Sequence, residues 1–133
     1  NQLVGPENRA YLVNGSVLIT GDEHPDISAP IDTLVIPIDA PWIRATDHIA
    51  YVQRVRPRRV IAVHDGLVND DGLAVARAVL GSPRCKGVDD VIFPAVGEKA
   101  SFECVTGDWG SAGPDVESRF AQRGRDDAVT LPY

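Results

Sequence analysis

Two apolar runs rich in β-branched residues most constrain the fold of this chain. They are Thr33–Pro37, with the sequence TLVIP, and Val60–Val63, with the sequence VIAV. Runs without polar alternation are typical of strands that are covered on both faces, as in a sheet with helices packed on it. The intervening segment has apolar residues at helical spacing and predicts a helix over 46–56, which Pro57 ends. Strand, helix and strand in this order predict a right-handed parallel crossover.

A β-hairpin is predicted ahead of this unit, with strands over 10–13 and 16–20. Asn14 and Gly15 lie between them, and this dipeptide tolerates the positive φ that both central positions of a tight hairpin turn need. A closing pair of strands is predicted after a second helix, over residues 70–80.

Each predicted helix has a capping residue and an apolar face. For the helix over 46–56 we expect Thr46 or Asp47 as the cap, and the inward stripe is Ala45, Ile49, Val52 and Val55. A second helix is predicted over 70–80, with Asn69 or Asp70 as its cap and Gly81 at its end. Its inward stripe is Leu73, Ala76, Val79 and Leu80.

Length and composition exclude several classes of protein. The 133 residues suffice for one domain, and 44% apolar content is too high for a wholly disordered chain. No apolar run approaches the roughly 18 residues that span a bilayer, and no secretion signal opens the chain. A net charge of −6 argues against a general nucleic-acid binder. Because the sequence has no Met, we expect it to be a processed or truncated piece of a longer protein.

The two cysteines indicate a reducing compartment. Cys85 and Cys104 lie far apart and in no Cys-x-x-Cys pattern, which excludes a disulfide scaffold and a thiolate zinc site. We expect two small buried thiols in a cytoplasmic protein, while a single bridge between them stays open.

The chain divides into three parts. Residues 1–9 form a lead-in, 10–105 form the folded domain, and 106–133 form a loose polar tail. The closing strands of the domain are expected over 91–93 and 101–105.

Polar residues follow three of the predicted strands. They are Asp22, Asp39 and the pair His64 and Asp65. In open α/β sheets, ligands bind outside the carboxyl ends of the strands, where residues distant in sequence can meet. A carboxylate and a neutral imidazole are suitable donors for one divalent metal ion, although zinc takes four ligands.

Three segments in order, at residues 10–22, 36–42 and 57–66, resemble the second half of a metallo-β-lactamase-fold hydrolase. Their sequences are AYLVNGSVLITGD, IPIDAPW and PRRVIAVHDG, and the lactonase-like branch is the most similar. The resemblance implies half of an αββα sandwich, a mixed sheet with two main helices packed on it. It also implies one or two divalent ions, zinc above all, with manganese or iron as alternatives.

The resemblance gives each strand-end residue a role. Asp22 would bridge two metal ions and His64 would ligate the second, while a hydroxide held between the ions attacks a small-molecule substrate. Asp65 would orient His64, and Asp39 and Trp42 would line the substrate pocket. The family's other ligands come from a His-x-His-x-Asp-His motif and a further histidine in the first half, which this sequence lacks. The isolated chain, with two of about seven ligands, is therefore expected to be inactive, and whether it binds any metal ion stays open.

Several of these residues also have simpler interpretations. Asp22 could be a turn residue and His64 a hydrogen-bonded core histidine. His24 is expected to be a loop residue and His48 a solvated surface group. The basic cluster Arg54, Arg56, Arg58 and Arg59 is interpreted as a helix C-terminus and a solvated edge rather than a nucleic-acid site.

Two functions are consistent with these residues. The first is a metal-dependent hydrolase to which this chain contributes the second half of the site. The alternative is a catalytically inactive half-domain that serves as a structural or interaction module. Such a module would expose the sheet face that the missing half normally covers, and would pair with that half or with a second copy.

Overall fold

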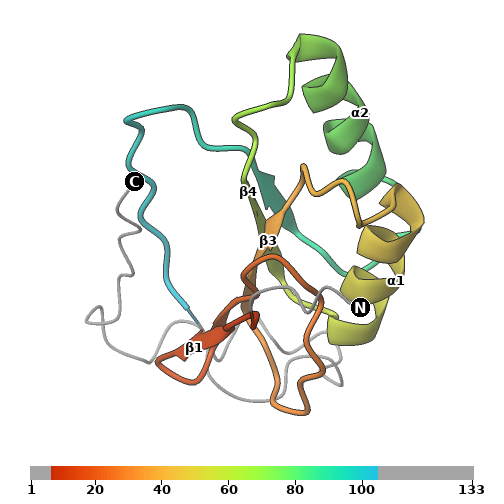
Figure 1. Ribbon diagram of the computed structural model, residues 1–133. Helices are drawn as coiled ribbons and strands as arrows, with labels where there is room; N and C mark the ends of the chain where they lie inside the picture. The colour runs from red at the N-terminus through yellow and green to blue at the C-terminus, as the bar shows by residue number, and fades with distance from the viewer. Residues whose placement is uncertain (1–6, 105–133) are drawn as a thin grey trace.

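A mixed five-stranded sheet organises residues 7–104, the part of the chain that this computed structural model describes. Its elements are β1 (Tyr11–Val13), β2 (Val17–Ile19), β3 (Thr33–Pro37), α1 (Ala45–Val55), β4 (Arg59–Val63), α2 (Asp70–Leu80) and β5 (Asp90–Ile92). The strands lie in chain order, with β1 antiparallel to β2 and all later neighbours parallel (Figure 1). The expected α/β class with a mixed sheet and two helices is confirmed.

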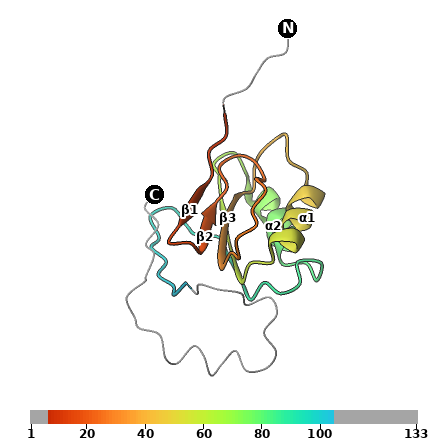
Figure 2. The same cartoon turned by 90° about the horizontal axis from the view of Figure 1, so that it is seen from below.

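The predicted strand–helix–strand unit is present and is repeated once. The chain alternates β3, α1, β4, α2 and β5, and both helices lie on the same side of the sheet (Figures 1 and 2). In the register of β3 and β4, Leu34 pairs with Val60 and Ile36 with Ala62. All five residues of β3 are buried, as expected for a central strand covered on both faces.

The hairpin turn forms as predicted. Asn14 and Gly15 both have positive φ, at 50° and 66°, and the Ser16 amide donates to the Val13 carbonyl (3.1 Å). This backbone twist matches that of the flanking strands, so the dipeptide sets the register of β1 on β2.

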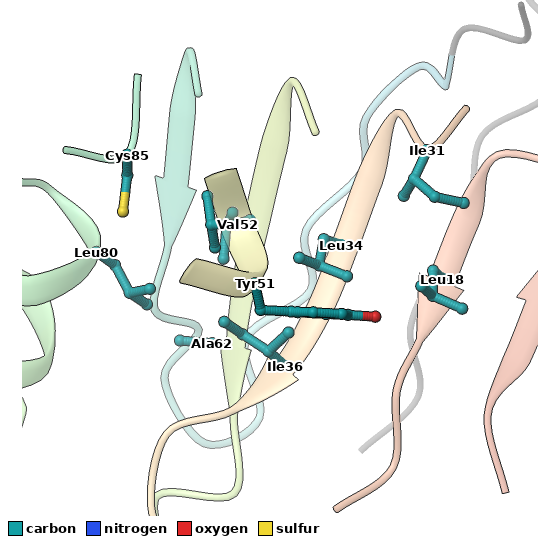
Figure 3. Packing of buried hydrophobic residues seen from close by; sticks show 10 residues of the cluster. Leu18, Ile31, Leu34, Ile36, Tyr51, Val52, Ala62, Leu80 and Cys85 are labelled. Carbon is teal, nitrogen blue, oxygen red and sulfur yellow. The ribbon is translucent and has the colours of Figure 1, made fainter. Parts of the chain in front are cut away.

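The helix side of the sheet carries the larger core. Tyr51 and Val52 of α1 pack in one cluster with Leu34, Ile36 and Ala62 of the central strands (Figure 3). Further buried members of this cluster are Leu18, Ile31, Val60, Leu80 and Cys85.

The opposite side of the sheet is also covered. Val17, Val35 and Ile61 are buried there, and the half-buried Phe102 and Cys104 pack against them. The segment leading to residue 104 crosses this side of the sheet (Figures 1 and 2). The exposed face expected of a half-domain module is therefore absent at these three central positions.

Local details of α1 differ from the prediction. The helix begins at Ala45, so its cap is Arg44, whose amide donates to the Asp47 carboxylate (2.8 Å). Thr46 and Asp47 are thus inside the first turn, and both were wrong as caps. Ala45 is exposed, but the other members of the predicted stripe face the core, with Val52 buried and Ile49 and Val55 half-buried. The inward side also includes His48 and Tyr51, which a search for aliphatic spacing does not select.

The second helix follows the prediction closely. It spans Asp70–Leu80, and the Asn69 side chain accepts from the Gly72 amide (2.9 Å). Leu80 is buried, and the other members of the predicted stripe, Leu73, Ala76 and Val79, are less buried.

Only part of the predicted closing strand pair forms. β5 spans Asp90–Ile92, while the segment over 101–104 has a single bridge residue, Glu103, rather than a strand. Arg58 and Arg59 hold this segment instead, because their guanidinium groups donate to the Glu103 carbonyl (3.3 and 3.4 Å). The lead-in up to residue 6, the last residue of the predicted strand and the tail over 106–133 lie outside the described residues.

The solvated edge predicted for Arg58 and Arg59 is wrong. Asp32 is fully buried at the start of β3 and lies 3.0 Å from Arg58 Nε and 3.7 Å from Arg59 Nη1. A buried carboxylate needs such partners, since desolvation without them is costly. Arg54 does match the expected exposed helix end and pairs with Asp26 (3.2 Å).

The two cysteines are both free thiols, as expected from their spacing. Cys85 is buried in the core on the helix side, and Cys104 is half-buried on the other side of the sheet. Burial raises the pKa of both thiols. Neither helix within residues 7–104 has the length and apolarity to cross a bilayer.

Candidate site at the carboxyl edge of the sheet

The carboxyl ends of β2, β3 and β4 share one edge of the sheet because these strands are parallel. Asp22 follows β2, Asp39 follows β3, and His64 and Asp65 follow β4. The topology therefore brings all four predicted residues to the same edge.

The backbone of Asp22 is held from two sides. Its amide donates to Asn8 Oδ1 (2.9 Å), and its carbonyl accepts from Trp42 Nε1 (2.8 Å). Gly21 precedes it with φ of 69°, a conformation suited to glycine that turns the chain out of β2. Within residues 7–104, no hydrogen bond or ion pair engages the Asp22 carboxylate.

His64 is fixed at one ring nitrogen. Nδ1 lies 2.6 Å from the Asp39 carbonyl oxygen, and since a carbonyl can only accept, Nδ1 carries the proton and donates. The neutral ring then has its lone pair on Nε2, the atom through which imidazole commonly binds metal ions. His64 is exposed, and its φ of 62° marks the point where the chain leaves β4.

One loop links these two residues. It runs from Ile38 to Trp42 after β3, and it contacts His64 through the Asp39 carbonyl and Asp22 through the Trp42 indole. The Ile38 amide donates to the Val63 carbonyl (2.9 Å), which ties the loop to the end of β4. Asp22 and His64 are 42 positions apart in the sequence. They nevertheless contact two residues of one short connection, Trp42 and Asp39, which are only three positions apart.

The structure shows the surroundings of the remaining predicted residues, Asp65, Asp39 and Trp42. The orienting contact to His64 comes from the Asp39 backbone, whereas the Asp65 carbonyl accepts from the Val68 amide (2.9 Å). Trp42 is 60% exposed and acts through its indole N–H. Asn8 was missed, because a single asparagine in a lead-in without periodicity has no sequence signal.

Asp22 and His64 alone do not complete a metal centre. A structural or catalytic zinc ion takes at least three protein ligands, and no group of three or more His, Cys, Asp or Glu side chains within residues 7–104 could hold a metal ion. The chemistry of the two donors, one carboxylate oxygen and one imidazole nitrogen, suits zinc, manganese or iron. Any such ion would need further ligands from elsewhere.

The other two histidines form a separate pair. His24 lies in a loop, as predicted, but its ring stacks on Tyr51 (4.4 Å between centroids), and its Nε2 lies 3.2 Å from His48 Nδ1. His48 was predicted to be solvated, yet it is only 6% exposed. It lies on the inward side of α1, where burial, helped by the nearby His24, lowers its pKa to about 4, against the opposing charge of Asp47.

Comparisons with known proteins add no assignment: no family model matches the chain, and neither a curated protein nor a solved structure matches it. The resemblance to metallo-β-lactamase-fold hydrolases therefore stays a prediction, and any functional assignment depends on the geometry of the carboxyl edge.

Proposed function

We propose that this chain contributes Asp22 and His64 to the site of a metal-dependent hydrolase of the metallo-β-lactamase type. Its remaining ligands would come from residues outside 7–104, on the same chain or on a partner. The hydrogen bond from His64 Nδ1 to the Asp39 carbonyl carries this proposal, because it selects the tautomer whose Nε2 can bind a metal ion.

The surroundings of Asp22 support the same proposal. Its peptide group is held by Asn8 and Trp42, while its carboxylate is unpaired among the described residues. Fixing a ligand's backbone and leaving its side-chain oxygens available reduces the entropy lost when a metal ion binds. Zinc is the first choice of ion, and a small molecule is the proposed substrate.

Paramagnetic mapping tests whether the edge attracts a divalent ion. When Mn²⁺ is added to the ¹⁵N-labelled chain at low molar ratio, we expect the amide signals of Asp22, Asp39 and His64 to broaden first. Excess Zn²⁺ should restore them. His64→Ala should remove this pattern, and His24→Ala is the matched control that should leave it unchanged. Broadening centred on His24 and His48, or spread evenly over acidic residues, would contradict the proposal.

Hydrolysis is tested in the assembled protein that contains the further ligands. There, His64→Ala should lose one equivalent of bound metal and most of the hydrolytic rate, while His24→Ala should keep both. Elemental analysis and turnover of ester, lactone and phosphodiester substrates are the measurements. Unchanged metal content in His64→Ala would exclude His64 as a ligand.

A non-catalytic interaction module is the second candidate. Two apolar side chains in the loops that leave the carboxyl edge favour it, since Trp42 is 60% and Leu67 is 92% exposed. Exposed apolar groups of this kind are often covered by a partner. A metal-free dimer without hydrolytic activity, seen by size-exclusion chromatography and elemental analysis, would support the module over the hydrolase.

A further inference from the structure

We propose that Asn8, in the N-terminal lead-in, is a positioning residue that sets the direction of the Asp22 carboxylate. This inference rests on the proposed function, because it assigns Asn8 a role in preparing one of the two candidate ligands.

The side-chain amide of Asn8 brackets the residue before Asp22. Its Nδ2 donates to the Thr20 carbonyl (2.9 Å), and its Oδ1 accepts from the Asp22 amide (2.9 Å). One planar amide thus fixes the peptide groups on both sides of Gly21. Thr20 is itself fully buried and bonded to Val35, so Asn8 ties Asp22 to a rigid part of the sheet.

Gly21 shows that this contact is a close one. A Cβ atom at this position would collide with Asn8 Oδ1 and lie 2.8 Å from the Arg9 carbonyl oxygen. Its φ of 69° is also a conformation that favours glycine, so only glycine fits at position 21. Asn8 and Arg9 therefore pack directly on the turn that carries Asp22.

Trp42 completes the restraint from the other side. Asn8 holds the Asp22 amide and Trp42 holds its carbonyl, so both backbone groups are used while the carboxylate projects without a described partner. Both functional groups of the Asn8 amide are engaged in backbone hydrogen bonds. Asn8 therefore acts through Asp22 rather than as a ligand.

Amide exchange and Mn²⁺ mapping test the role of Asn8 together. In Asn8→Ala, we expect hydrogen exchange of the Asp22 amide to accelerate about tenfold, and the apparent Mn²⁺ affinity reported by Asp22 to fall about fivefold. His64 should still broaden. Asn8→Asp keeps an acceptor for the Asp22 amide but loses the donor to the Thr20 carbonyl, so it should slow the exchange of the Asp22 amide only in part. Glu7→Ala, at the exposed neighbouring position, should change neither measurement.

The outcomes separate this inference from the proposed function. If the unmodified chain shows no broadening at the edge, its two described donors do not bind Mn²⁺ by themselves. The metal content and hydrolytic rate of His64→Ala in the assembled protein then decide the proposed function, and the exchange rate of the Asp22 amide in Asn8→Ala still decides the role of Asn8. If the unmodified chain broadens and Asn8→Ala behaves identically, only the inference is overturned. Uniformly faster exchange across the sheet in Asn8→Ala would also overturn it, since that result indicates a purely structural role.

Discussion

His48 and His64 differ in what surrounds the Nε2 atom. In His64 this nitrogen is at the exposed carboxyl edge, whereas in His48 it is buried and has no hydrogen-bond partner within residues 7–104. A buried ring nitrogen without a partner is costly, and adding a proton and a charge to that ring costs more. The His48 ring is therefore held neutral.

Acid should weaken the fold through His48. Its pKa is about 4 in the folded chain and 6.5 ordinarily, so the unfolded chain takes up a proton first as the pH falls. Stability is then full above pH 6.5 and declines towards pH 4, by at most about 3 kcal/mol. Urea unfolding across this pH range measures how steeply the free energy of unfolding changes with pH. His48→Leu should flatten this dependence and His64→Leu should not, and equal slopes in both variants would refute the assignment.

At the scale of helices and strands, features that depend on neighbouring residues were predicted better than features that depend on tertiary contacts. The Asn14–Gly15 turn and the Asn69 cap were correct, because each depends on backbone groups within three residues. The start of α1 was wrong because Asp47 works from inside the first turn, reaching back to the Arg44 amide. The buried positions of His48 and Tyr51 were missed for another reason, since their burial follows from contacts with the distant His24 and Pro25.

The cap of α2 offers a quantitative test at this scale. Asn69→Ala removes the acceptor for the Gly72 amide and should destabilise the chain by about 1 kcal/mol. Asn69→Asp keeps an acceptor oxygen and is the matched control, expected to stay within a few tenths of a kcal/mol. Chemical denaturation measures both, and an equal loss in the two variants would argue against the capping hydrogen bond.

For the whole molecule, the hairpin, the parallel crossover and the edge that gathers the polar residues could be predicted from the sequence. Most of the contacts that support these polar residues could not. Asp22 and His64 were predicted to share this edge, and they do, because the parallel strands before them end together. The Asp39 carbonyl contacts the His64 ring, and the Asn8 side chain contacts the Asp22 amide. Both contacts join segments that are distant in the sequence, which local sequence patterns do not indicate. The covering of the second sheet face by Phe102 and Cys104 is likewise a long-range result.

Truncation of Ile61 tests whether this second face is a true core. Ile61 is 1% exposed and packs with Val17 and Val35 on the side away from the helices. Ile61→Ala should cost about 2–4 kcal/mol, whereas the same type of truncation at the exposed Leu67 should change stability by less than about 0.5 kcal/mol. Similar unfolding midpoints for the two variants would mean that this face is not packed in solution.

The connection from Ile38 to Trp42 contacts both candidate ligands. Because it contacts His64 near its start and Asp22 at its end, its length sets the spacing between them. An insertion between Asp39 and Trp42 would disturb the hydrogen bond from the Trp42 indole to Asp22, although Asn8 would still hold the Asp22 amide. Insertions after Asp65 would leave the contacts of this connection with both residues intact. Changes in the ligand that the carboxyl edge binds are therefore expected to come from sequence changes in the segment between His64 and α2.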